Sequence, residues 1–174
     1  MTDDKQSQQH AYQLRWLWLS ALVVIIDQVS KHLATALLKG GPSIEVLPVV
    51  NLTWAQNFGA AFSIFANAGG WQRWVFIILT TFVSMVLVVW IKRLKGHETW
   101  LAIALALVLG GALGNLYDRI FLGYVVDFVS VHYQRHYFPV FNLADSAITI
   151  GAVMLIIDTF WLSRQSKIAN KDER

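Results

Sequence analysis

Residues 100–117 read WLAIALALVLGGALGNLY, a stretch of 18 residues without a charged side chain. A helix needs about 20 mostly apolar residues to cross the hydrocarbon core of a bilayer. This stretch therefore predicts a transmembrane helix, and its glycines, Gly110, Gly111 and Gly114, favour close packing against another helix. Residues 74–91, WVFIILTTFVSMVLVVWI, form a second uncharged stretch of the same length.

Two further apolar stretches contain charged residues. Residues 14–38 include Asp27 and Lys31, and residues 142–162 include Asp145 near their start. Both stretches are long enough to span a membrane. The sequence therefore predicts four transmembrane helices.

The composition supports a single membrane domain. The 174 residues are 56% hydrophobic and 14% charged, with a mean hydropathy of +0.48, and this balance is typical of an integral membrane protein. We predict a membrane all-α fold, a four-helix bundle within one domain of residues 1–174 that has polar tails at about 1–13 and 163–174. The first apolar stretch is interpreted as a helix and not as a cleaved signal peptide, because polar residues at 27–31 separate it from the small residues at 34–36.

Basic residues gather on one side of the predicted bundle. Three of them lie between the second and third helices, and others precede the first helix or follow the fourth: Lys92, Arg93, Lys95, Arg15, Arg164, Lys167, Lys171 and Arg174. Cytoplasmic segments next to membrane helices are rich in Lys and Arg, so we expect both termini in the cytoplasm. The basic residues thus adjoin apolar spans, and no nucleic-acid partner is expected.

The extracytoplasmic side has longer connections with β-strand patterns. Residues 44–54, IEVLPVVNLTW, and 124–133, YVVDFVSVHY, are rich in β-branched and aromatic residues. Pro48 limits the first strand to a sheet edge or interrupts it. We predict a small sheet that lies on the membrane surface as a cradle.

Asp127 and Asp145 are the candidate catalytic residues, because both fall at this outer edge of the membrane. A carboxylate beside lipid is costly and usually has a function or a partner. Two carboxylates in one site do not ionise together easily, so one stays protonated as an acid while the other serves as a base. This pair predicts activation of water against an amide. Asp145 alone could also serve to stabilise the positive end of a helix dipole.

Other catalytic schemes lack their residues. The chain has no cysteine, no HExxH and no GxSxG motif. Ser30 next to Lys31 is the remaining serine–base alternative, but neighbouring residues point to different faces of a helix. The five histidines show no metal-ligand spacing, so neither a metal nor another cofactor is expected.

Several polar residues are spaced so that they share a helix face. Asp27 and Lys31 are four apart and predict an ion pair, either as a way to enter the membrane or as a brace near a site. Asn115 and Arg119 are also four apart, and they either point inward as donors or, for Arg119, extend to the interface. Asn142 lies three residues before Asp145.

A further polar segment, QNFGAAF at residues 56–62, follows the first predicted strand. Small residues beside Asn57 allow the backbone to pass close to a partner or a ligand. A simple turn explains the same pattern.

Taken together, five short motifs resemble the lipoprotein signal peptidase family, the bacterial signal peptidase II. They are DQVSK at 27–31, NFGAAFS at 57–63, GGALGNLYDR at 110–119, VDF at 126–128 and FNLAD at 141–145. The resemblance extends over about residues 14–162. It implies an intramembrane aspartic endopeptidase of the bacterial inner membrane. Such an enzyme removes the signal peptide from diacylglyceryl-modified prolipoproteins by cutting before the lipidated cysteine.

The resemblance also implies roles for individual residues. Asp127 and Asp145 match the catalytic pair, and the other matched residues line or support the site: Asn57, Asn115, Arg119, Asn142, Asp27, Lys31 and Gly59. The implied partners are prolipoproteins with a diacylglyceryl cysteine, membrane lipids and the inhibitory peptide antibiotic globomycin.

Two other functions remain compatible with the residues alone. A small transporter or lipid-handling protein would use the charges of Asp27, Lys31 and Arg119 as a proton or anion path, although four spans are few and no repeat is present. A non-catalytic membrane subunit would use the same charges to hold partner helices.

Overall fold

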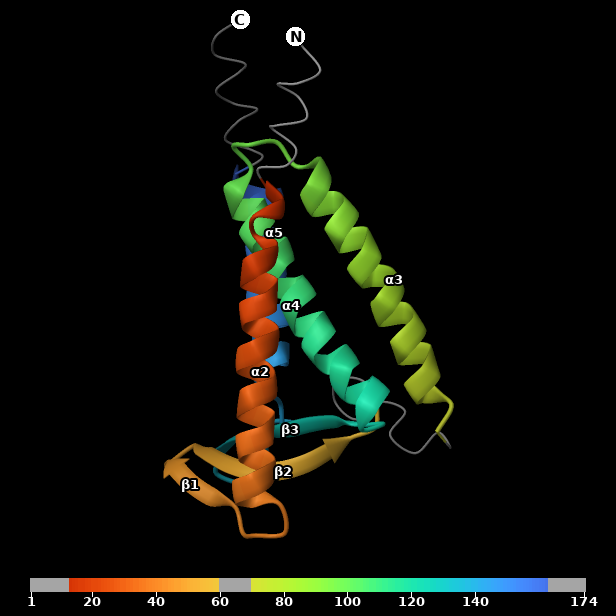
Figure 1. Cartoon of the computed structure of the whole chain (residues 1–174). Helices are drawn as coiled ribbons and strands as arrows, with labels where there is room; N and C mark the ends of the chain where they lie inside the picture. The colour runs from red at the N-terminus through yellow and green to blue at the C-terminus, as the bar shows by residue number, and fades with distance from the viewer. Residues whose placement is uncertain (1–12, 60–69, 163–174) are drawn as a thin grey trace, which may run out of the picture.

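The computed structural model describes residues 13–59 and 70–162 (Figure 1). Its long helices are α2 (Leu17–Leu38), α3 (Gln72–Arg93), α4 (Thr99–Phe121) and α5 (Leu143–Ile157). A short π-helix, η2 (Asp158–Leu162), continues α5. All four helical segments are long and apolar enough to cross a membrane, which confirms the predicted four-helix fold.

Helix α4 is the central helix, because it packs against α2, α3 and α5. The predicted role of its glycines is confirmed. A Cβ atom at Gly110 would lie 2.7 Å from the Cβ of Val23 on α2, and one at Gly111 would contact the backbone oxygen of Ala144 on α5. Glycine thus allows α4 to approach two helices at backbone distance. In Figure 1, α3 lies at the right-hand edge of the bundle, where α4 is the helix that it packs against.

The strands form one antiparallel sheet with the order β1-β2-β3-β4. Their bounds are β1 (Ile44–Leu47), β2 (Val50–Asn57), β3 (Val125–Tyr133) and β4 (His136–Tyr137). The sheet lies at one end of the helices (Figure 1), opposite to the connection between α3 and α4. The predicted surface sheet is therefore present at the end where α4 finishes and α5 begins.

The predicted interruption at Pro48 is confirmed, so residues 44–54 belong to two strands and not to one. Pro48 and Val49 form a turn, and the chain reverses there into the hairpin β1–β2. Proline has no N–H to donate to a neighbouring strand, which is why the strand ends before it. The second strand then continues to Asn57, three residues beyond the predicted end.

Gln13 also differs from its prediction as part of a polar tail. Its side chain is fully buried and donates hydrogen bonds to the backbone oxygens of Lys95 (2.8 Å) and Gly96 (3.0 Å). The segment before α2 is thus attached to the connection between α3 and α4. The other residues of the two predicted tails lie outside the described part of the chain.

Candidate active site

Asp127 and Asp145 come together at the sheet end of the helices, and Asn142 connects them. The side-chain amide of Asn142 donates to Oδ1 of Asp127 at 2.7 Å. Its backbone N–H donates to Oδ2 of Asp145 at 3.3 Å, and its Oδ1 accepts the backbone N–H of Asp145 at 2.9 Å. One residue therefore contacts both carboxyl groups.

The position of Asp145 follows from helix capping. Asn142 is the N-cap of α5 and Asp145 is its N3 residue, and the two form a reciprocal capping box. The helix-dipole interpretation of Asp145 is thus confirmed as one of its roles. Just before the cap, Phe141 pairs with Val129 of β3, so the start of α5 is held beside the strand that carries Asp127.

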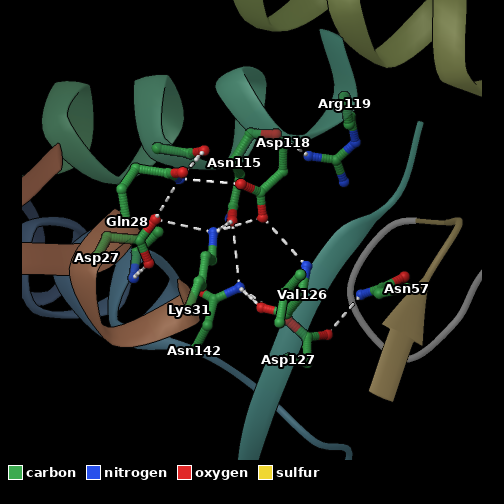
Figure 2. A network of polar contacts seen from close by, with 12 residues as sticks. Asp27, Gln28, Lys31, Asn57, Asn115, Asp118, Arg119, Val126, Asp127 and Asn142 are labelled. Carbon is green, nitrogen blue, oxygen red and sulfur yellow. Dashed lines mark hydrogen bonds and ion pairs between the residues drawn. The ribbon is translucent and has the colours of Figure 1, made fainter. Parts of the chain in front are cut away.

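Two further asparagines complete the surroundings of the two carboxyl groups. Asn57, at the end of β2, donates to Oδ2 of Asp127 at 3.0 Å (Figure 2). Asn115 of α4 donates to Oδ1 of Asp145 at 2.8 Å. Each of the four carboxyl oxygens therefore accepts one N–H group, and all these donors except the backbone N–H of Asn142 are side-chain amides.

Arg119 points toward the backbone near Asn57, as one of its two predicted alternatives has it. Its Nη2 donates to the backbone oxygen of Gly59 at 2.9 Å, and Nη1 to that of Asn115 at 3.3 Å. Asn57 Oδ1 accepts the N–H of Gly59 at 3.0 Å. This bond between Asn57 and the residue two positions later is typical of a turn, the simpler of the two predicted explanations, and residues 60–63 of the motif lie outside the described residues.

The carboxyl group of Asp127 is almost completely buried, with 2% of the residue exposed. The pKa of Asp127 is raised from its ordinary value to about 7. Burial is the largest cause of this rise, and the negative charge of Asp145 is the second. The hydrogen bonds from Asn57 and Asn142 and the charge of Lys31 act in the opposite direction on this pKa. Asp127 is therefore a carboxyl group that keeps its proton close to neutral pH.

A buried ionic cluster lies next to the pair. Lys31 forms the predicted ion pair with Asp27, with Nζ to Oδ2 at 2.8 Å, and a second one with Asp118 at 3.0 Å. Ser30 Oγ donates to the backbone oxygen of Asp27 at 2.7 Å. Because the ammonium of Lys31 is bound to acceptors, it cannot serve as the base for Ser30, and the serine–lysine alternative is wrong.

Sequence reasoning missed Asp118 and Gln28. Gln28 donates to Asp118 Oδ1 at 2.9 Å and to Asp27 Oδ2 at 3.2 Å. Asp118 lies near the end of α4 and is 1% exposed. Its spacing of three residues from Asn115 was the available signal, since this spacing places both on one helix face.

Comparisons with known proteins show which family the chain resembles. A family model described as signal peptidase (SPase) II matches residues 19–161. The chain is 58% identical over 159 residues to the lipoprotein signal peptidase of Pseudomonas aeruginosa (strain UCBPP-PA14), covering 90% of this chain and 94% of that one. It is 54% identical over 172 residues to the lipoprotein signal peptidase of Pseudomonas syringae pv. tomato, covering 98% and 99%.

Two solved structures of a bacterial membrane enzyme, determined by the in meso method, are also similar. The first is 37% identical with a TM-score of 0.74, and the similarity covers 84% of this chain and 90% of the other. The second is 34% identical with a TM-score of 0.73, with coverage of 84% and 93%.

Proposed function

The chain belongs to the signal peptidase II family of aspartic peptidases, and from this premise we propose that Asp127 and Asp145 are its catalytic residues. Family membership makes the chain a multi-pass membrane enzyme that removes signal peptides from prolipoproteins. It also shows that the transporter and non-catalytic subunit alternatives are wrong. The residues that perform the cleavage are the subject of the proposal.

The observation that carries the proposal is the shared contact of both carboxyl groups with Asn142. In the proposed reaction, Asp127 is protonated and donates a hydrogen bond to the scissile carbonyl. Asp145 is ionised and takes a proton from a water molecule as the water oxygen attacks the carbonyl carbon. The C–N bond then breaks, and the proton held by Asp145 passes to the leaving amine. No covalent intermediate with the protein is needed.

The position of the site along the helices supports a lipid-anchored substrate. The site lies where the surface sheet meets the ends of the helices (Figure 1), so a peptide bond next to a membrane-embedded lipid would reach it. The basic residues Lys92, Arg93 and Lys95 lie at the other end of the bundle. We infer that the sheet faces the extracytoplasmic side and that both termini are cytoplasmic. We propose cleavage immediately before the diacylglyceryl cysteine.

The substrate can be tested with the purified full-length protein and a diacylglyceryl-modified prolipoprotein. Mass spectrometry should find a released signal peptide and a product that begins with the lipidated cysteine. The same prolipoprotein without the lipid is the matched control and should be cleaved far more slowly, and globomycin should block the reaction. Equal cleavage of both forms, or a cut at another bond, would contradict the proposed substrate.

A further inference from the structure

The residue before each candidate catalytic aspartate is held by a buried carboxylate. Val126 precedes Asp127, and its backbone N–H donates to Oδ2 of Asp118 at 3.1 Å. Ala144 precedes Asp145, and its backbone N–H donates to Oδ1 of Asp27 at 2.9 Å. The strand and the helix that carry the two aspartates are thus attached in the same way to α4 and α2.

Lys31 joins these two carboxylates (Figure 2). Its Nζ lies 2.8 Å from Asp27 Oδ2, 3.0 Å from Asp118 Oδ2 and 2.9 Å from Asn115 Oδ1. A lysine ammonium has three N–H donors, so each donor has one acceptor. The side chains of Lys31, Asp27 and Asp118 are 2%, 0% and 1% exposed, so water does not compete for these contacts.

The same ammonium fixes the orientation of Asn115. Because Oδ1 of Asn115 accepts from Lys31, and also from Asn142 at 3.2 Å, its amide group points to Asp145. Gln28 donates to both carboxylates of the cluster, which stabilises their excess negative charge. The side chains of Lys31, Asp27, Asp118 and Asn115 are therefore each held in place by hydrogen bonds or ion pairs.

We propose that Asp27, Lys31 and Asp118 form a positioning cluster that sets the separation between the carboxyl groups of Asp127 and Asp145. The proposal rests on the proposed function of that pair. None of the three residues contacts the carboxyl oxygens of the pair directly; they act through the amides of Val126 and Ala144 and through Asn115. A catalytic group displaced by about 1 Å can lower a rate roughly 10²-fold, so such a cluster controls turnover.

Asp118 is the best residue for the test. Lys31→Met would leave two buried carboxylates without a cation, and the loss of folding would hide any other effect. Asp118→Ala keeps the pair of Asp27 and Lys31, but it removes the acceptor of the Val126 N–H and the contacts of Asp118 with Lys31 and Gln28. We expect kcat to fall roughly 10²-fold while KM changes little. Asp118→Asn keeps an oxygen that can accept from Val126, so it should recover part of the lost kcat.

Ser20→Ala is the matched control. Ser20 lies on α2, is 3% exposed and donates one buried hydrogen bond to the backbone oxygen of Ala106 on α4 at 2.8 Å. The substitution weakens the same pair of helices without touching the ionic cluster. It should lower the unfolding temperature and leave kcat per folded molecule close to that of the wild type.

The pH profile of kcat/KM separates positioning from stability. The charged groups around Asp127 are Asp27 and Lys31 on α2, Asp118 and Arg119 on α4, and Asp145 on α5. If the two catalytic carboxyl groups move apart, they interact less, and the acid and alkaline limbs of the profile approach each other. A mere loss of stability leaves both limbs in place.

The inference is overturned if Asp118→Ala has the kcat and the pH limbs of Ser20→Ala. If Asp118→Ala does not fold, Asp118→Asn decides: a lowered kcat with a narrower profile supports the cluster, and a wild-type profile overturns it. Asp127→Asn and Asp145→Asn are measured in parallel. Cleavage by these two variants would reject the proposed function itself. If both are inactive, a wild-type result for the Asp118 variants rejects only the positioning cluster.

Discussion

At the scale of single residues, the proposed mechanism depends on the proton of Asp127. Burial and the charge of Asp145 raise the pKa of Asp127 to about 7, so below this pH it is protonated and can polarise a carbonyl group. Asp145 is partly exposed at the start of α5 and accepts two N–H groups. The buried Asp127 is therefore the proposed acid, and one proton on the pair is the state that the proposed mechanism requires.

The pH dependence of cleavage follows from this assignment. As the pH rises through about 7, Asp127 loses its proton and the proposed acid disappears, so kcat/KM should fall on the alkaline side. The hydrogen bond from Asn57 lowers the pKa of Asp127. Asn57→Ala should therefore move the alkaline limb to higher pH, which initial rates in a series of buffers can measure. An unmoved limb, or one at lower pH, would contradict the assignment of the proton.

Helical spacing at this scale predicted contacts between residues of the same helix. Asp27 with Lys31 and Asn142 with Asp145 are separated by one helical turn, and their contacts are the expected ones. The bond between Gln28 and Asp118 joins residues 90 positions apart. Spacing within one helix does not determine which face of another helix it meets, so this contact required the structure.

At the scale of elements, the start of α5 combines two functions in Asn142. Its Oδ1 caps the helix, and its amide donates to Asp127. Serine and asparagine are comparable N-caps, whereas alanine costs about 1 kcal/mol. Asn142→Ser should therefore keep the unfolding temperature near that of the wild type, and Asn142→Ala should lower it.

Both substitutions remove the amide that binds Asp127, so both should reduce kcat. Because Asp127 is protonated in the proposed mechanism, this is a bond between neutral groups, which contributes about 0.5–1.5 kcal/mol and corresponds to a loss of roughly 2- to 10-fold. Thermal unfolding and cleavage rates of the two variants provide the measurement. If Asn142→Ser regains wild-type activity together with stability, Asn142 is only a helix cap.

The elements themselves were predictable to different degrees. The helices follow from long apolar stretches, and their observed bounds extend the predicted ones by a few residues at α3 and α4. Strand propensity on both sides of Pro48 and an interruption there were predictable, but the hairpin β1–β2 was not. Propensity describes each residue alone, whereas the reversal depends on pairing between Ile44 and Leu52.

At the scale of the whole molecule, the sheet and the basic connection between α3 and α4 lie at opposite ends of the helices (Figure 1). The absence of cysteine from the sequence makes this orientation easy to test. Glu45 on β1 and His97 between α3 and α4 are both exposed. In intact spheroplasts, a membrane-impermeant maleimide should label Glu45→Cys and should label His97→Cys only after permeabilisation. The cysteine-free chain is the control, and the reverse pattern would contradict the topology.

The whole site depends on contributions from α2, β2, β3, α4 and α5, which meet only in the folded chain. The proposed function requires that the carboxyl groups of Asp127 and Asp145 act together on one peptide bond. Replacing either by asparagine removes one carboxyl group with little change in volume. A folded variant of this kind should still bind lipid-modified prolipoprotein and globomycin.

The most direct measurement is the rate at which purified Asp127→Asn and Asp145→Asn cleave a diacylglyceryl-modified prolipoprotein, followed by mass spectrometry beside the wild type. If both carboxyl groups are required, each variant should lose at least about 10³-fold in kcat, which is within the range of general acid–base catalysis. A folded variant of either kind that cleaves the same bond at a rate close to that of the wild type would contradict the catalytic pair.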